Sequence, residues 1–525
     1  MISDVLVIGA GGAGLVSAIK ACESGAKVVV ITKEYPTRSQ TCMAQGGINA
    51  ALGNATDDSI QAHVQNTLKS AHGIADQEAI ELLCQSAPDA VRWLDDIGVC
   101  FSRTKDAKIA QRTLGGASAP RACYAQDYTG LKILHTLYDK ALSLGIEIIN
   151  ERYLLEYTVR DGIACGATVL NIQTSEIEKY ESRSVIVATG GYSRIYDKHS
   201  TNSSSTTGDG IAAAIYAGAR VSDMEFVQFH PTALKNSSVL ISESARGAGG
   251  YLLNSAGQRF VNELLPRDEV ARAINDEIDK GEDIFLDIRH LGEEFIDEEL
   301  PQERKLSKLY ENIDPVYDLI PIKPVAHYTM GGIEVDKKSL TNIEGLYAVG
   351  ECANHRVHGA NRLGGNSLLE LIVFGMQAGE NAAIYSLAHS HVQDKDEQAT
   401  PLYSSLNPHT DSQINFYDIR EELGDIFYKR VGISRDKKNL EDALAHVEKY
   451  IEDIPLMGAD DSSKIYNTNL IEFLEFKNML TLSRLVLTGA ITREESRGAH
   501  FRSDYPQENE KFKKHTVIDR DGEVL

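Results

Sequence analysis

Val5-Leu-Val-Ile8 runs directly into Gly9-Ala-Gly-Gly-Ala-Gly14, and this stretch decides the fold of the chain. A helix-like segment, residues 15–23, follows the glycines and leads to a second apolar run at residues 27–31. The pattern is a βαβ unit in outline. Its glycines allow a tight turn and close approach of the backbone to a pyrophosphate, while the helix N-terminus offers free N–H groups to phosphates. The stretch predicts a Rossmann-like α/β domain that binds a dinucleotide.

The residues after this turn bear on which dinucleotide it binds. A lone GxGxxG motif also occurs in loops of purely structural purpose, but here it stands between a strand pattern and a helix pattern, as a nucleotide site requires. The acid that would bind the ribose of NAD is missing from the end of the second strand, where Thr32 and Lys33 stand and Glu34 comes one position late. The sequence therefore does not favour NAD.

Two later segments repeat the pattern of a strand entering glycines, Val185-Ile-Val-Ala-Thr-Gly-Gly191 and Gly345-Leu-Tyr-Ala-Val-Gly-Glu351. Three such turns suit a long, folded dinucleotide such as FAD. Glu351 has two interpretations: its carboxylate accepts hydrogen bonds from ribose or ribityl hydroxyls, or it is a surface glutamate at a strand end. The sequence leaves both open.

The composition limits the class of protein. The 525 residues suffice for two or three domains around a large cofactor, and 25% charged residues are typical of a globular protein. A net charge of −23 without a long Lys/Arg run argues against a nucleic-acid partner, and an anionic substrate would need locally gathered positive residues. Because no apolar stretch reaches roughly 18 residues and no leader pattern precedes the first strand, we expect a cytoplasmic chain. The seven cysteines show no metal or haem spacing and fit reduced thiols.

Changes of pattern along the chain predict five segments. The FAD-binding domain has two parts, 1–232 and 327–385, and an α+β capping domain, 233–326, is inserted between them. A polar linker at 386–412 leads to a C-terminal helical domain, 413–525. Five apolar residues at helical spacing predict a stripe of this last domain that packs into the core: Leu440, Leu444, Val447, Ile451 and Ile454.

Clusters of cationic and hydrogen-bonding residues lie in the regions expected around the flavin. They are centred on His230, residues 242–247, Arg267, His327 and Arg362. Singly, each has an ordinary explanation, since a lone histidine is most often structural and a lone arginine usually belongs to a solvated ion pair. Together they favour a site for a small dicarboxylate, because arginine pairs bidentately with a carboxylate while imidazoles and a hydroxyl hold the other end.

Longer runs show that the chain resembles the flavoprotein subunit of the succinate dehydrogenase and fumarate reductase family. The resemblance covers almost the whole length. Besides the first glycine turn, it is carried by Pro36-Thr-Arg-Ser39, Ala44-Gln-Gly-Gly-Ile-Asn-Ala-Ala-Leu-Gly-Asn54, Phe226-Val-Gln-Phe-His-Pro-Thr232, His358-Gly-Ala-Asn-Arg-Leu-Gly364 and Glu495-Ser-Arg-Gly-Ala-His500. It implies FAD-dependent interconversion of fumarate and succinate by hydride transfer between flavin N5 and the dicarboxylate.

The resemblance also implies roles for individual residues. Arg267 would donate and accept the proton, with Glu243 and Arg246 relaying protons to it from solvent. The dicarboxylate would be bound by His230, Ser242, His327 and Arg362, Ser242 keeping the hydroxyl of the family's usual threonine. The residues implied to hold FAD are Gly9, Ala10, Gly11, Gly12, Ala13, Gly14, Thr32, Lys33, Ser39, Gln40, Thr41, Gly46, Gly47, Asp209, Glu351, Ser367 and Leu368.

The lack of cluster and haem ligands in the chain bears on its partners. The chain has no such ligands of its own. The resemblance therefore implies an electron-transfer complex with an iron–sulfur protein subunit, linked to quinone through a membrane or quinone-reactive subunit. Such complexes serve anaerobic respiration or the tricarboxylic acid cycle. The chain would then lie in the cytoplasm, or peripherally on the cytoplasmic face of the inner membrane through its partners. A thiol-linked electron donor is an alternative.

Three residues depart from the family pattern or bear on the direction of the reaction. Gln40 replaces the histidine through which many members link FAD covalently, and an amide nitrogen cannot be alkylated in that way, so we expect tightly but non-covalently bound FAD. Loss of the link lowers the flavin's reduction potential and slightly favours fumarate reduction. Gln45 favours succinate oxidation instead, because succinate dehydrogenases often have glutamine at this position. Leu114 replaces an aromatic residue that is usual in the family, and this change bears on substrate preference.

Two other functions compete with this interpretation. L-aspartate oxidase is a stand-alone relative that needs a carboxylate for the substrate's ammonium group, and residues 111–116 provide none. A flavin-binding protein without catalysis is the other, and it is disfavoured because all seven catalytic and substrate positions keep suitable chemistry.

Overall fold

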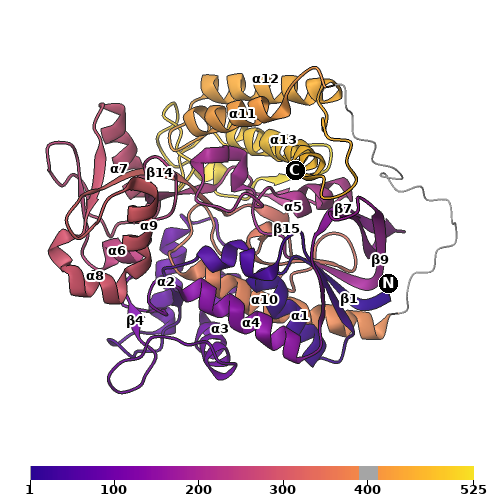
Figure 1. The fold of residues 1–525 in the computed structure, drawn as a ribbon, viewed down its shortest axis with the longest axis horizontal. Coiled ribbons are helices and arrows are strands. Elements are labelled where there is room, and N and C mark those ends of the chain that lie inside the picture. Colours follow the sequence, from indigo (N-terminus) through magenta and orange to yellow (C-terminus); the bar gives the residue numbers. More distant parts are fainter. Residues whose placement is uncertain (1, 390–411) are drawn as a thin grey trace.

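The computed structural model describes residues 2–389 and 412–525, and its largest sheet there has seven strands and lies towards the right of Figure 1. Five strands are parallel: β1 (Ile2–Ile8), β2 (Val28–Ile31), β6 (Glu147–Ile149), β9 (Ile177–Val187) and β16 (Leu346–Ala348). Across the sheet they follow the order β6-β2-β1-β9-β16, so the strand order reverses between β1 and β9. Sheets of this kind bind their ligand at that point, at the carboxyl ends of the strands. The Rossmann-like α/β class is confirmed.

Successive side chains of the central strands point to opposite faces of the sheet, so the core has two layers. In β1, Val5 and Val7 pack on the side of α1 (Gly12–Glu23) and α10 (Asn366–Ala388). Leu6 and Ile8 instead join the core that includes α5 (Asp209–Tyr216) and the C-terminal helices. Because both faces are covered there, the strands are apolar where they cross the core, at residues 5–8 of β1, throughout β2 and at residues 185–187 of β9. The helices α2 (Ile60–Ser70), α3 (Gln77–Asp96) and α4 (Thr129–Ser143) complete the first layer, and the hairpin of β7 (Arg152–Arg160) and β8 (Ile163–Asn171) extends the sheet beyond β9.

The inserted capping domain forms the left-hand lobe of Figure 1. Its antiparallel sheet has the order β11-β14-β13-β12, formed by Val227–Leu234, Ile320–Thr329, Ile284–Asp287 and Tyr251–Leu253. Four helices complete the domain: α6 (Glu243–Gly247), α7 (Arg267–Asp279), α8 (Glu293–Glu299) and α9 (Pro301–Glu311). The domain has its own hydrophobic core, as an α+β capping domain should. The boundaries expected at 232/233 and 326/327 fall inside β11 and β14, which pair with each other, and their placement stays a prediction.

The C-terminal part is built from α11 (Phe416–Arg430), α12 (Lys437–Asp453) and α13 (Thr468–Thr492). The five-residue stripe of this region packs as expected, with Leu440 and Val447 buried and the other three residues partly buried against the same core. The tail returns to the FAD-binding domain, because β18 (Val517–Ile518) pairs with β10 (Val221–Ser222) in the sheet β17-β15-β10-β18, whose other strands are Gly332–Glu334 (β15) and Ala353–Asn354 (β17). Of the predicted linker, residues 390–411 lie outside the described ranges, and α10 continues to Ala388.

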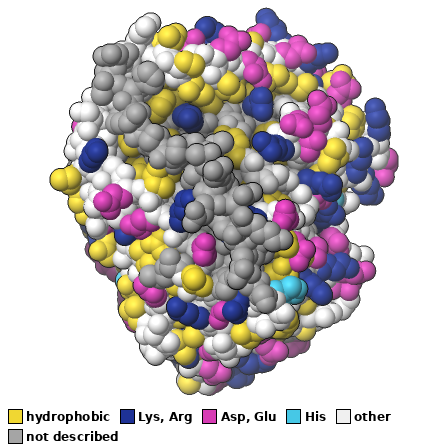
Figure 2. Space-filling model, turned by 90° about the vertical axis from the view of Figure 1, so that its right-hand side faces the viewer, with side chains coloured by type: hydrophobic (Ala, Val, Ile, Leu, Met, Phe, Trp, Pro, Cys, Tyr) yellow, Lys and Arg dark blue, Asp and Glu magenta, His cyan; other side chains and the backbone are white. Residues whose placement is uncertain are grey.

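The surface shows no separation of charge on the face that Figure 2 presents. Acidic and basic side chains are interspersed there, although the chain as a whole has a net charge of −23. Within residues 2–389 and 412–525, no helix combines the length and the apolar character needed to cross a lipid bilayer.

Candidate active site

A large cavity opens at the carboxyl ends of β1 and β9 and runs to the capping domain, with about 1640 Å³ of empty space including its mouth. The first glycine turn forms one wall. Gly9 has φ +105°, and a Cβ there would overlap the backbone oxygen of Ala188 at the end of β9. A Cβ on Gly14 would overlap the oxygen of Gly9. Glycine is therefore required at both positions for the turn and the helix to fit together.

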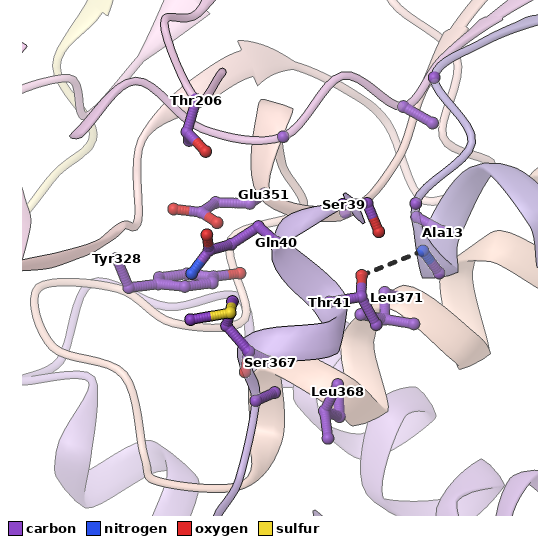
Figure 3. Close-up of a pocket in the computed structure, with 18 of the residues that line it drawn as sticks. Ala13, Ser39, Gln40, Thr41, Thr206, Tyr328, Glu351, Ser367, Leu368 and Leu371 are labelled. Atoms are coloured by element: carbon purple, nitrogen blue, oxygen red, sulfur yellow. Dashed lines mark hydrogen bonds between the residues drawn. The ribbon is translucent and has the colours of Figure 1, made fainter. Parts of the chain in front are cut away.

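The N-terminus of α1 faces this cavity, and its N-cap residue provides no side-chain cap. Its N-cap is Gly11, which has no side chain, and its first turn contains no acidic residue. The N–H of Gly12 donates to Thr41 Oγ1 at 3.0 Å, a contact drawn in Figure 3. The N–H groups of a helix N-terminus attract phosphate, so this wall suits the pyrophosphate of a dinucleotide.

Polar atoms that lack a protein partner also line the cavity. Ser39 Oγ, Gln45 Oε1 and Thr189 Oγ1 are buried and make no hydrogen bond with the described residues. Buried polar groups normally have partners, so such atoms around one cavity indicate a bound polar group. Together with the bare helix N-terminus, they fit FAD.

The residues expected to hold FAD come together around this cavity, with one exception. Gly14 does not line it and acts through the packing of the turn. Two others, Lys33 and Asp209, line the cavity but are bound to each other at 2.7 Å, and Glu475 of α13 binds the same ammonium at 2.7 Å. Burial opposes the charge of Lys33, yet the two carboxylates raise its pKa above the ordinary value. This cluster ties the end of β2 to the C-terminal helices.

Glu351 is not a surface residue. Its Oε1 accepts hydrogen bonds from the N–H of Thr329 at 2.9 Å and from Thr329 Oγ1 at 3.1 Å. Gly191 provides the room, because a Cβ there would overlap the Glu351 carboxylate. Burial raises the pKa of Glu351 to about 7. In the view of Figure 3, the Gln40 side chain reaches into the cavity between Glu351 and Tyr328.

The capping-domain end of the cavity is centred on Arg267 at the start of α7. Glu243 Oε2 accepts from Arg267 Nε at 2.9 Å and from Nη2, while Gln228 Oε1 accepts from Nη1 at 3.1 Å. The other Glu243 oxygen accepts from the N–H of Gly115 at 2.7 Å. The guanidinium is thus fixed on two sides by side chains from different elements.

Arg246 lies behind this pair and does not line the cavity. Its Nη2 is 3.7 Å from Glu243 Oε1, and its Nη1 donates to the carbonyl oxygen of Glu263 at 2.7 Å. Burial alone would raise the pKa of Glu243, but Arg267 and Arg246 outweigh it and hold that pKa below its ordinary value. The three side chains form a row from the cavity inward, which ends at the buried Arg246, and the relay of protons from solvent stays a prediction.

Two histidines and a serine face Arg267 across the cavity. The rings of His230 and His327 lie 4.9 Å apart, and the pairing of β11 with β14 shifts by one residue at His327, a bulge of the kind that redirects side chains. Burial, followed by the field of Arg267, lowers the pKa of both rings well below the ordinary value. Nδ1 of His230 accepts from the N–H of Thr232 at 3.2 Å, so the neutral ring carries its proton on Nε2. Ser242 Oγ accepts from the N–H and the hydroxyl of Ser244, which leaves its own proton to donate.

Arg362 completes the ring of cations. Its guanidinium lies over the ring of Tyr328 at 4.3 Å, and its Nη2 donates to Gln228 Oε1 at 3.0 Å. Burial and then Arg267 lower the pKa of Arg362 to about 10, so it remains charged at neutral pH. The Tyr328 hydroxyl donates to Glu370 Oε2 at 2.8 Å, which fixes the ring. Despite the chain's negative net charge, this end of the cavity can bind an anion.

Sequence reasoning missed Gln228 and Tyr328. Gln228 holds Arg267 and Arg362 on one oxygen, and it stands in the quoted run 226–232, two positions before His230. Alternation along a strand places such residues on one face, so this signal was present. Tyr328 follows His327 directly and would face away in a regular strand, and only the bulge brings both to the cavity.

Known proteins resemble the chain over almost its whole length. Residues 4–368 match the family described as FAD binding domain, and residues 420–524 match the family described as fumarate reductase flavoprotein C-term. A succinate dehydrogenase flavoprotein subunit of Rickettsia felis is 38% identical, over 99% of this chain and 94% of the relative. A fumarate reductase flavoprotein subunit of Mycobacterium tuberculosis is 37% identical over 99% and 95%. A solved quinol–fumarate reductase chain with menaquinol molecules superimposes with a TM-score of 0.95 at 35% identity, covering 100% of this chain and 97% of that one.

Proposed function

Since this chain belongs to the family of succinate dehydrogenase and fumarate reductase flavoprotein subunits, we propose that it interconverts fumarate and succinate as the FAD-dependent subunit of an electron-transfer complex. One observation carries the proposal: His230, Ser242, His327 and Arg362 surround the cavity end at which Arg267 is held against Glu243. Arg362 is a bidentate donor for one carboxylate, and the histidines and Ser242 are donors for a second, as a C4 dicarboxylate requires.

We propose the following roles for these residues. Bound FAD would supply a hydride to, or take one from, a carbon of the substrate. Arg362 would pair with one carboxylate, and the His230 Nε2–H and the Ser242 hydroxyl would donate to the other. Arg267 would give its proton to the second carbon, and Glu243 with Arg246 would return a proton to Arg267. These donors lie at the buried end of the cavity, where little water competes for them.

Purified protein is expected to reduce fumarate with a reduced viologen dye as electron donor. Replacement of Arg362 by Met should raise the KM for fumarate by about 100-fold, because a buried bidentate ion pair is lost. The rate of dye oxidation measures this effect, and Arg92→Met, an exposed change on α3, serves as the control. A protein that is loaded with FAD but inert toward both fumarate and succinate would refute the proposal.

We further propose that FAD is bound without a covalent bond. Gln40 accepts a hydrogen bond from the N–H of Ser203 at 2.7 Å through its Oε1, and its amide nitrogen is not nucleophilic. Precipitation with acid should therefore release yellow FAD into the supernatant and leave a colourless pellet. Yellow colour that stays with the pellet would contradict this prediction.

The linkage of the flavin bears on the direction of the reaction. A non-covalent flavin has the lower reduction potential, so we favour fumarate reduction as the physiological direction, with an iron–sulfur subunit and a quinone-reactive subunit as partners. L-aspartate oxidase is disfavoured, because Glu243, the carboxylate among the named residues at this end of the cavity, is already paired with Arg267. Isolation of the native complex would show whether an iron–sulfur subunit accompanies the chain or a thiol serves as donor.

The pH dependence tests the state of the histidines. His230 and His327 have a pKa well below the ordinary value of about 6.5, so both stay neutral as the pH falls from 8 to 6. Since kcat/KM reports the groups of the free enzyme, its profile for fumarate should show no inflection near 6.5. An inflection there that disappears in His230→Asn or His327→Asn would show that a histidine titrates normally.

A further inference from the structure

The capping domain touches the FAD-binding domain at a second place, away from Arg267. Asp127 belongs to the FAD-binding domain, in the loop between β5 (Ala122–Cys123) and α4, and its side chain is completely buried. Its Oδ2 accepts from the N–H of Gln302 at 2.6 Å. Gln302 is the second residue of α9, and the N-cap residue of that helix, Leu300, provides no side-chain cap. Asp127 therefore caps a helix of the other domain.

The same turn of α9 reaches the substrate site. Glu303 follows Gln302, is completely buried, and accepts from the N–H of Ser242 at 3.1 Å. Ser242 is the serine whose hydroxyl faces the cavity. The position of α9 therefore sets the backbone of Ser242, and Asp127 sets the position of α9.

The Asp127 loop is also joined to the flavin wall. Arg112, from β4 (Gln111–Arg112), donates to the carbonyl oxygens of Gln45, Gly46 and Gln126 at 2.8 to 2.9 Å. Gln126 in turn donates through Nε2 to the carbonyl oxygen of Glu298 at 2.9 Å. One guanidinium thus holds both the cavity lining at 45–46 and the loop that binds the capping domain.

Burial of the carboxyl groups at this contact is unfavourable to the free energy of folding. Burial raises the pKa of Asp127 to about 6, and burial together with Asp127 raises the pKa of Glu303 well above its ordinary value. Asp127 Oδ1 and Glu303 Oε2 have no hydrogen-bond partner among the described residues. Buried carboxylates that keep one oxygen without a partner destabilise a fold, so their presence at a domain contact points to a function beyond stability.

We propose that Asp127 is a positioning residue that fixes the capping domain through the first turn of α9 and so places the Ser242 hydroxyl for the dicarboxylate. The contact would serve substrate binding, while Arg267 and Glu243 serve the chemistry. The inference rests on the proposed function, because its kinetic readout needs a dicarboxylate substrate.

The test compares Asp127→Ala and Asp127→Asn in the FAD-loaded protein. The alanine variant should raise the KM for fumarate about tenfold, because loss of the cap destabilises the first turn of α9 and so displaces Ser242, and it should change kcat less than about threefold. The asparagine variant should keep most of the affinity, because its amide oxygen still accepts from the N–H of Gln302. Asp436→Ala is the matched control: Asp436 caps α12 through Asn439 N at 2.9 Å within the C-terminal domain, so its loss should lower the Tm but leave the KM unchanged.

Hydrogen exchange provides a readout without substrate. Amide protons of α9 should exchange faster in Asp127→Ala than in wild type and remain protected in Asp436→Ala. Unchanged exchange in α9, or a KM within twofold of wild type, would overturn the proposal. If Asp127→Ala does not fold, Gln126→Ala removes the neighbouring bond to Glu298 and should raise the KM about threefold, and an unchanged KM there would also count against it. Wild-type protein that does not reduce fumarate would remove the proposed function, whereas the exchange measurement would still test the contact.

Discussion

Replacement of Arg267 by Gln is expected to lower kcat for fumarate reduction by roughly 10²- to 10⁴-fold, the usual range for loss of a positioned general acid. The glutamine has no proton to give to the substrate carbon. It also leaves Glu243 buried beside Arg246 alone, because the bonds from Nε and Nη2 of Arg267 are lost. Flavin content should stay near that of wild type, since FAD is held by other walls of the cavity.

Two further variants separate chemistry from charge. Arg267→Lys keeps the positive charge, but a single ammonium cannot bind Glu243 and Gln228 in the geometry of the planar guanidinium, so its loss should be nearly as large. Arg272→Gln is the control on the same helix. Arg272 does not line the cavity, and its guanidinium donates to Asp268 and to the Gly498 carbonyl oxygen instead. Stopped-flow rates together with the flavin absorbance measure both effects. Near-normal turnover of FAD-loaded Arg267→Lys or Arg267→Gln would refute the assignment.

The fold was predictable where local pattern and tertiary role agree. The apolar run at 5–8, the glycines and the following helix are one consecutive unit, so their geometry is set by neighbours in the sequence. Lys33 stands after β2, where an NAD-binding protein would have an acid, and its ammonium group is bound by Asp209 and Glu475. Glu475 is more than 400 residues away, and no local pattern could have named it as a partner.

The active site was predictable in its residue types but not in its connections. Six of the seven catalytic and substrate residues line the cavity, and Arg246 stands directly behind Glu243. Their spacing depends on Gln228, which joins Arg267 to Arg362, and on the bulge at His327. A bulge is a property of two paired strands, so the sequence of one strand does not reveal it. The same holds for Asp127, whose partner is a helix of another domain.

The second large effect is expected at the glycine turn. Gly9→Ala should lower the stability of the protein, whereas Gly11→Ala should weaken the binding of FAD. In Gly9→Ala the new methyl group meets the backbone oxygen of Ala188 at a φ of +105°, which L side chains rarely adopt. The strain and the overlap should together destabilise even the FAD-free protein by about 3 kcal/mol or more. Gly11 has φ −71°, and a Cβ there would make only ordinary contacts, the nearest being Thr41 Oγ1 at 3.6 Å.

The Gly11→Ala protein should therefore fold normally without FAD, while its methyl group occupies the cavity wall at the N-terminus of α1, where the phosphates of FAD must approach the backbone. We expect its Kd for FAD to rise by about tenfold or more, with an unchanged Tm of the FAD-free form. Thermal unfolding of both stripped variants and titration with FAD, followed by flavin fluorescence, distinguish the two cases. The prediction that Gly9 serves packing against β9 and Gly11 serves binding of the pyrophosphate would be contradicted by either of two results. One is that Gly11→Ala destabilises the FAD-free protein as much as Gly9→Ala does, and the other is that Gly11→Ala binds FAD with the wild-type Kd.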